Sequence, residues 1–400
     1  MQRFASHVIG LATRRGLGVP LQVAALALAG RSLVPGEQGR LFVGLALAAW
    51  TLLLGGAGLL PMLLRRFDEA ALRACAAEGR YRALVAAVLF AALGSALLGP
   101  DPALLGVAAL HLLLPLQLAA AAGLRHGRTG ALARAELQAR ILGVVLAAAA
   151  WLAGLETAGP WWVLLLLPSL LPGLLLALAQ PAAIRRALLP WGPTRRPRAA
   201  PTRIAAGELL RATYFQGGLP IVHAVAGAAP GFGAAFTLHR VGVLLPSALA
   251  TTVQGPLSRG APEAARDTLR RLLPSWLGLG AAGAVIAWVA ARPVLELLFP
   301  TLPALDEAVA SLRVLALAVP ALFGAGLCLP YLLARDGERA ALAISTAALA
   351  TWLVLLLALA PTVGPRAGAI ALSATEWLVF VLALAAVRRG APVPAPRGAA

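Results

Sequence analysis

The chain is dominated by long apolar runs, each bounded by charged or helix-breaking residues. A membrane-spanning α-helix needs about 20 mainly apolar residues, and twelve runs of this kind can be traced. The first and the seventh hold helix-bending residues, Pro20 in one and Gly217, Gly218 and Pro220 in the other, which a membrane helix tolerates where neighbours satisfy the freed backbone groups. The pattern predicts an all-α polytopic membrane protein with spans at 9–33, 41–64, 83–99, 103–124, 139–155, 161–180, 206–228, 233–255, 272–291, 309–333, 341–360 and 367–387.

The composition favours the same class. Hydrophobic residues make up 60% of the chain and charged residues only 12%, whereas soluble proteins carry about 25% charged residues. The net charge of +18 comes from arginine alone, because the sequence contains no lysine. A P-loop that hydrolyses ATP and a Schiff-base lysine are therefore both excluded. Two cysteines, Cys75 and Cys328, are too few for a disulfide framework and are predicted to be free thiols.

The arginines alternate with the predicted spans. One set of connecting segments, which includes both termini, holds 27 of the 34 arginines, the other set holds five, and Arg211 and Arg240 fall inside spans. Basic residues are retained in cytoplasmic loops, so this asymmetry predicts that both termini are cytoplasmic. The asymmetry also explains the excess of basic residues without a nucleic-acid partner. The cytoplasmic arginines are expected to attract anionic membrane lipids to some extent.

The longest polar interval divides six predicted helices from six others. It is rich in Pro and Arg and is expected to be a cytoplasmic linker. The predicted organisation is an N-terminal six-helix lobe at 1–189, the linker at 190–203, a C-terminal six-helix lobe at 204–390 and a disordered tail at 391–400.

The two lobes show a weak internal repeat. An offset of 194 residues superposes Gly39 on Gly233 and Phe42 on Phe236. Because each lobe has an even number of helices, the repeat is parallel, with its pseudo-twofold axis along the membrane normal. Such repeats place a substrate site near the bilayer midplane between halves that rock against each other. The alternative is gene duplication in a bundle that does not transport, a membrane scaffold.

Several short motifs carry a resemblance to a known family. They are Leu33-Val34-Pro35-Gly36-Glu37-Gln38-Gly39, Gly58-Leu59-Leu60-Pro61, Gly231-Phe232-Gly233-Ala234-Ala235-Phe236, Gln254-Gly255-Pro256-Leu257-Ser258-Arg259 and Leu333-Ala334-Arg335-Asp336-Gly337-Glu338-Arg339. This series resembles the polysaccharide flippases, the O-antigen, teichoic-acid and exopolysaccharide exporters of the multidrug/oligosaccharidyl-lipid/polysaccharide (MOP) exporter superfamily. The resemblance extends over about residues 15–389.

The resemblance implies a function and a location. It implies that an undecaprenyl-pyrophosphate-linked saccharide, a precursor of lipopolysaccharide, O-antigen or exopolysaccharide, is translocated across a bacterial inner membrane by alternating access. Membrane lipids, a polysaccharide polymerase and glycosyltransferases would be the partners. The alternative within the superfamily is an ion-coupled multidrug antiporter. We expect no cofactor and no enzymatic activity, since no His/Cys cluster has metal-ligand spacing and no Gly-x-Ser-x-Gly motif is present.

The two arginines inside spans are the first candidates for a substrate site. An ionised side chain at the bilayer centre costs about 2.5–3.5 kcal/mol on insertion scales, so it marks a functional position by default. Arg240 in the eighth span offers a planar fork of donors that suits a pyrophosphate, and Arg211, near the inner end of the seventh span, is expected to help it. The alternatives for Arg240 are a side chain that extends towards the membrane surface or an ion pair with Glu376.

Three further ionisable residues complete the set of candidates. Glu376, near the middle of the last span, is expected to accept a coupling proton or cation, or to form an ion pair. His223 and His239 are candidate substrate-binding residues because histidine titrates near neutrality. His223 also stands where the resembling family often has an aspartate. The alternative for each histidine is a hydrogen bond between helices.

Overall fold

The computed structural model describes most of the chain. Its described residues are 18–59, 69–119, 129–180, 202–227, 229–243, 262–335 and 337–389, with the single positions Leu63, Ile184, Arg185, Leu188 and Pro246. Most of the predicted linker, residues 190–201, and all of the predicted tail at 391–400 lie outside them.

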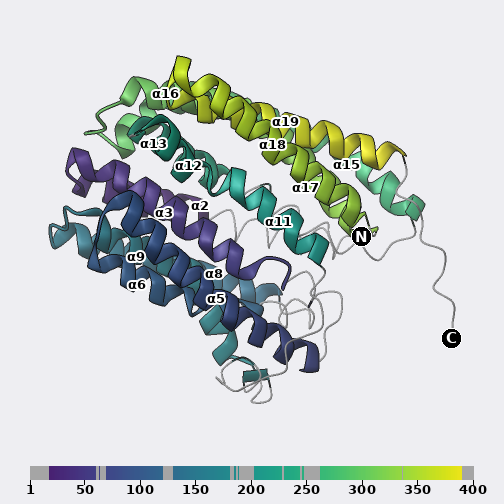
Figure 1. Ribbon diagram of the computed structural model, residues 1–400, viewed down its shortest axis with the longest axis horizontal. Coiled ribbons are helices and arrows are strands. Elements are labelled where there is room, and N and C mark those ends of the chain that lie inside the picture. Colours follow the sequence, from purple (N-terminus) through teal and green to yellow (C-terminus); the bar gives the residue numbers. More distant parts are fainter. Residues whose placement is uncertain are drawn as a thin grey trace.

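The structure is a bundle of long helices arranged as two lobes (Figure 1). The first lobe contains α2 (Gly18–Ser32), α3 (Pro35–Gly56), α5 (Glu69–Leu98), α6 (Pro102–His111), the 3-10 turn η1 (Leu114–Leu118), α8 (Thr129–Leu152) and α9 (Ala158–Leu178). The second lobe contains α11 (Thr202–Phe215), α12 (Gly218–Ala226), α13 (Pro230–Gly242), α15 (Pro262–Leu298), α16 (Leu305–Ala316), α17 (Val319–Ala334), α18 (Glu338–Val363) and α19 (Arg366–Arg389).

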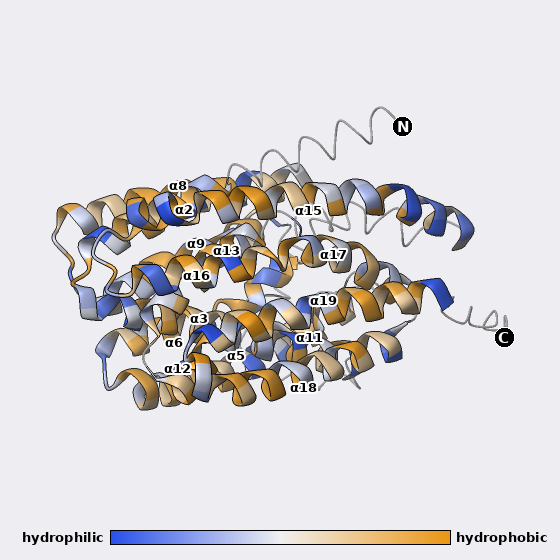
Figure 2. Cartoon of the chain, turned by 90° about the horizontal axis from the view of Figure 1, so that it is seen from above, coloured by the Kyte–Doolittle hydropathy of each residue, from blue (hydrophilic) through white to orange (hydrophobic). Residues whose placement is uncertain are grey.

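Each of the twelve predicted spans overlaps at least one described helix, which confirms the all-α polytopic fold. The spans predicted at 9–33, 41–64, 103–124 and 233–255 extend beyond the described residues. By length and composition, seven of the described helices can cross a membrane, and the bent pair α16 and α17 makes an eighth. Figure 2 shows hydrophobic residues over the middle of the helices and hydrophilic residues concentrated near their ends. This distribution is the one that a hydrocarbon layer requires of helices that cross it.

The helices extend past several predicted boundaries. The spans predicted at 83–99 and 272–291 are the central parts of α5 and α15, which begin at Glu69 and Pro262. Their first turns carry arginine, glutamate and alanine, all of which favour a helix. The apolar-run criterion stops at the first charges and therefore misses helix that continues into the aqueous or headgroup region.

Two spans are broken. The seventh divides at Gln216 and Gly217 into α11 and α12, where the sequence predicted bending. At Gly217 an added Cβ would lie 2.7 Å from the Thr213 carbonyl oxygen and 3.2 Å from the Trp50 ring, so only glycine fits against α3. The tenth span bends by 41° between α16 and α17, a break that the sequence analysis did not predict although Pro320 follows it directly.

The helices of the two lobes pack in corresponding pairs, as the predicted repeat requires. Helix α2 packs on α8 and α8 on α9 in the first lobe; α11 packs on α18 and α18 on α19 in the second. The lobes meet where α3 crosses α13, and a Cβ added at Gly233 would lie 3.0 Å from the Phe42 side chain. Gly233 and Phe42 belong to the positions that the sequence offset identified, so the pseudo-twofold related segments contact each other directly.

Candidate functional site

Three charged side chains lie at mid-depth of the second lobe. Arg211 is nine residues into α11, which places it about 14 Å from the start of that helix at 1.5 Å per residue. Arg240 and Glu376 are each ten residues into α13 and α19, about 15 Å from the starts of those helices. Half of a typical hydrocarbon core is also about 15 Å.

Glu376 points into the lobe because α19 buries one continuous stripe. Leu372, Val379, Phe380 and Ala383 lie three to seven positions from Glu376, and all are buried. This is the spacing of one helix face. The carboxylate has no exposed surface. This ionisable group at mid-depth therefore lies in the protein interior and does not face lipid.

The buried carboxylate belongs to a cluster with Arg211 and Tyr214. The Tyr214 side chain is 1% exposed, and its hydroxyl interacts with both the Arg211 guanidinium and the Glu376 carboxylate. Arg211 and Glu376 also lie within reach of each other's charge. Arg211 and Tyr214 are three positions apart on α11, so they share a helix face. The cluster joins α11 to α19 through charge.

The hydrogen bonding of this cluster is incomplete. The two carboxylate oxygens of Glu376 accept no hydrogen bond of standard geometry from a described residue, and the Tyr214 hydroxyl neither donates nor accepts one. The interaction is therefore electrostatic, without a closed bidentate ion pair. Buried polar groups are usually satisfied, and an exception at mid-depth identifies the cluster as a candidate site for an ion or a polar ligand.

The same helix also ties the two lobes together. The Glu208 carboxylate accepts a hydrogen bond of 2.6 Å from the backbone N–H of Gly58 in the first lobe. Gly58 has a positive φ of 75°, and a Cβ there would lie 2.9 Å from Ala205. The Trp50 indole N–H donates a bond of 3.4 Å to the Thr213 hydroxyl. Helix α11 therefore contacts the first lobe through Glu208 and Thr213. Glu208 is three positions before Arg211, so it lies on the face that carries the Arg211 cluster.

Arg240 is separate from this cluster. It is partly buried, and its guanidinium carbon lies 5.8 Å from the centre of the Phe236 ring. Within the part of the chain that the structure describes, no carboxylate forms an ion pair with Arg240, so the predicted alternative of an Arg240–Glu376 pair is not found; Glu376 faces Arg211 instead. A cation held only against an aromatic face can still bind an anion.

The histidines have different surroundings. His239 is buried on α13, with its ring 6.2 Å from Phe215, and its Nε2 has no partner among the described residues. His223 lies on α12, away from these contacts, and is partly exposed. His111, by contrast, bonds Thr51 at 2.8 Å and the Val107 carbonyl at 2.9 Å. His111 is therefore a structural helix-to-helix contact, whereas His223 and His239 each keep one buried ring nitrogen, Nδ1 and Nε2 respectively, without a partner among the described residues.

Sequence reasoning missed Tyr214 and the tie through Glu208. Tyr214 is one of only three tyrosines in the chain, and its position three residues after an in-span arginine is the signal that could have identified it. No group of three or more His, Cys, Asp or Glu side chains that could hold a metal ion occurs in the described ranges. Both cysteines are free, as expected, and both are buried.

The fold is similar to that of known transporter structures. By sequence, no family model and no curated protein matches the chain. In structure, the chain is similar to a lipid II flippase, MurJ, in an inward closed conformation, with a TM-score of 0.67, 12% identity, and 95% of this chain and 87% of that chain covered. It is also similar to a multidrug resistance MATE family transporter in an inward-facing conformation, with a TM-score of 0.63, 13% identity and 94% of each chain covered.

A third similar structure is a MATE protein in a bent conformation, with a TM-score of 0.62, 14% identity, and 96% of this chain and 94% of that chain covered. All three likenesses extend over nearly the whole chain, so the similarity in fold includes both lobes. They identify a fold that serves both lipid flipping and drug transport, and the substrate has to be argued from the site.

Proposed function

We propose that this protein is a flippase that translocates an undecaprenyl-pyrophosphate-linked saccharide across a bacterial inner membrane by alternating access, with both termini in the cytoplasm. The saccharide would be a precursor of O-antigen, lipopolysaccharide or exopolysaccharide. The polymerase and glycosyltransferases that make and use such precursors would be its partners.

The charge at mid-depth of the second lobe is the observation that supports this proposal. Two arginines, Arg211 and Arg240, lie there with the Glu376 carboxylate, and the Glu208 carboxylate lies within reach of Arg211 from one turn earlier on α11. Glu376 is within reach of Arg211, which leaves the Arg240 charge uncompensated by any described carboxylate. An uncompensated guanidinium attracts a pyrophosphate and offers it paired donors. It would repel the cationic compounds that a drug antiporter exports.

The tie between the lobes gives alternating access a physical basis. A transporter of this architecture rocks one half against the other around a central site. Several separate hydrogen bonds join the lobes, among them Glu208–Gly58, Trp50–Thr213 and Gln38–Thr301. Each contributes about 0.5–3 kcal/mol, which is small enough for the bonds to break and reform one by one during a transport cycle.

Ion-coupled drug transport is the second candidate, and two observations favour it. The buried Glu376 carboxylate has no standard hydrogen bond to a described residue, as a proton or cation acceptor would need. Among the similar structures are multidrug resistance transporters. In this reading, Glu376 would exchange the coupling ion and Arg211 would set its affinity.

Replacing Arg240 with glutamine distinguishes the two functions. No described carboxylate depends on Arg240, so the substitution leaves no buried charge unpaired, and membrane abundance should stay constant. Loss of a hydrogen-bonded charge on a phosphate costs about 1.5–3 kcal/mol, so export of the surface polysaccharide in a complemented deletion strain should fall by about tenfold or more. R240K, which keeps the charge without the fork, should be intermediate.

R271Q is the matched control, because Arg271 is an exposed arginine on α15; it should export normally. Unimpaired export by R240Q would contradict the flippase proposal. Extrusion of cationic dyes that is lost in E376Q, with the lipid-linked saccharide pool unchanged, would establish the antiporter instead.

A further inference from the structure

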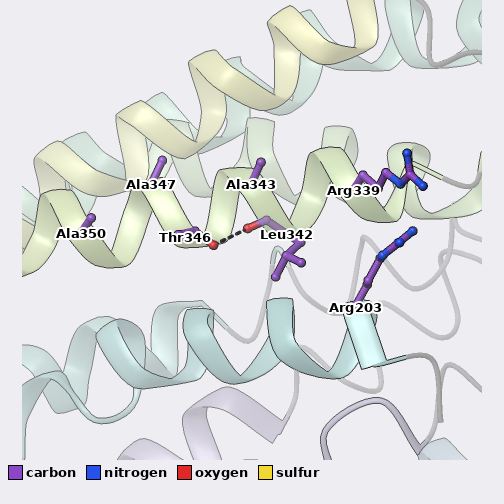
Figure 3. Close-up of a pocket in the computed structure, with 7 residues that line it drawn as sticks. All are labelled: Arg203, Arg339, Leu342, Ala343, Thr346, Ala347 and Ala350. Atoms are coloured by element: carbon purple, nitrogen blue, oxygen red, sulfur yellow. Dashed lines mark hydrogen bonds between the residues drawn. The ribbon is translucent and has the colours of Figure 1, made fainter. Parts of the chain in front are cut away.

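A groove runs along α18 in the second lobe, with the start of α11 at one end of it. It has a volume of about 580 Å³, within the range of ligand-binding sites. Arg203 on α11 and Arg339 on α18 lie at one end of it, and small or apolar side chains of α18 line the rest: Leu342, Ala343, Thr346, Ala347 and Ala350. Figure 3 shows both arginines at the same end, with the α18 residues following in a row.

The groove has the length of one membrane leaflet. Arg339 and Ala350 are eleven residues apart on α18, about 16–17 Å at the rise of an α-helix, and half of a hydrocarbon core is about 15 Å. Beyond Ala350 the same face of α18 carries Val354 and Leu357, which are larger and exposed. The small residues therefore form a depression that ends near the bilayer midplane.

The two arginines mark the headgroup end of the groove. Each lies in the first turn of its helix, at the end that the arginine distribution predicts to be cytoplasmic. Both are exposed, and no hydrogen bond or ion pair joins either of them to another described residue. Anionic lipids of the cytoplasmic leaflet attract an arginine near the surface by about 1 kcal/mol. At this position an arginine pair matches a lipid phosphate in depth and charge.

We propose that this groove binds an anionic phospholipid of the cytoplasmic leaflet, with its phosphate between Arg203 and Arg339 and one acyl chain along Ala343, Thr346 and Ala350. The length of the groove decides between lipids. An ordinary acyl chain is accommodated within one leaflet, whereas a long isoprenoid carrier would continue past Ala350, the last lining residue on α18, onto the larger exposed side chains of Val354 and Leu357. The site is distinct from the mid-depth charges and does not rest on the proposed flippase function.

Bound lipid would sit beside the contact between the lobes. Gly207, on the groove side of α11, lies against α18, since an added Cβ would be 3.7 Å from the Leu342 backbone. Glu208, the next residue, holds Gly58 of the first lobe. A lipid that bridges α11 and α18 would therefore hold α11 in the position that makes this tie.

Native mass spectrometry of the purified full chain tests the proposal. The protein is titrated with phosphatidylglycerol and, separately, with phosphatidylcholine of identical acyl chains. The wild type should bind phosphatidylglycerol selectively. The R203Q/R339Q variant should bind it about 30-fold more weakly, because two surface charges are lost, and its affinity for the two lipids should become equal. A343W keeps both arginines but fills the groove, and it should also lose binding.

The matched control is R270Q/R271Q, which removes two exposed arginines from α15, a helix that packs on α16, α17 and α2. This control should keep the selectivity of the wild type. The proposal is overturned if R203Q/R339Q retains selective binding, if the control loses as much as the groove variants, or if an isoprenyl phosphate displaces phosphatidylglycerol from the wild type.

Discussion

Neutralising Arg211 should destabilise the protein severely, and neutralising its partner as well should restore much of the loss. Glu376 has no exposed surface, and the Arg211 guanidinium is the cation within reach of its carboxylate. R211Q would leave that carboxylate buried without a compensating charge. Breaking a buried pair from one side costs about 3–5 kcal/mol, a large share of the 5–15 kcal/mol that stabilises a typical domain.

The double variant R211Q/E376Q removes both charges and leaves two amides beside the Tyr214 hydroxyl, which can donate to and accept from them. Its free energy of unfolding should fall by about 1–2 kcal/mol, because replacing both partners of a buried pair destabilises a protein far less than removing one. E376Q alone should lower the free energy of unfolding less than R211Q does, since Arg211 is only partly buried and its charge stays partly solvated.

Unfolding in detergent, followed by the fluorescence of the nine tryptophans, measures all three variants against the wild type. The coupling free energy from this double-mutant cycle should exceed about 2 kcal/mol. The reasoning fails if R211Q lowers the free energy of unfolding by less than about 1 kcal/mol. It also fails if the loss in the double variant equals the sum of the losses in the two single variants.

Two further predictions concern contacts away from the cluster. T51V removes the hydroxyl that His111 bonds at 2.8 Å and leaves a buried ring nitrogen unpaired, so the same unfolding assay should show a loss of about 1–3 kcal/mol; an unchanged stability would mean that the ring finds another partner. E208Q weakens the hydrogen bond to the Gly58 N–H. A cysteine placed at buried Ala205 should therefore react faster with an impermeant maleimide in the A205C/E208Q variant than in A205C alone. Equal rates would show that this bond does not hold the lobes together.

Much of the fold could be predicted because a membrane imposes it on the sequence. A hydrocarbon layer requires runs of about 20 apolar residues, and these runs locate every helix in the part of the chain that the structure describes. Gly217, Gly218 and Pro220 likewise indicated the break between α11 and α12, because local residue type decides where a helix bends. Boundaries in charged segments were wrong, as at α5, because helix propensity there continues after hydrophobicity stops.

The site was predicted only in part, because charge pairing depends on tertiary position. Arg211 and Glu376 were identified individually as costly charges inside spans, yet nothing local indicates that α11 and α19 bring them together. The sequence instead suggested Arg240 as a possible partner of Glu376. Tyr214 was missed because a tyrosine in an apolar helix has no distinctive pattern of its own, and its role emerges from its two charged neighbours.

The most direct test of the central claim is the lipid content of cells that lack this protein. Lipid extracts from a deletion strain and its parent would be compared by mass spectrometry, with the surface polysaccharide measured in parallel. The flippase account predicts that an undecaprenyl-pyrophosphate-linked saccharide accumulates and that the surface polymer is lost, and the mass of the lipid would identify the sugar. An unchanged lipid pool with the polymer intact would contradict the account.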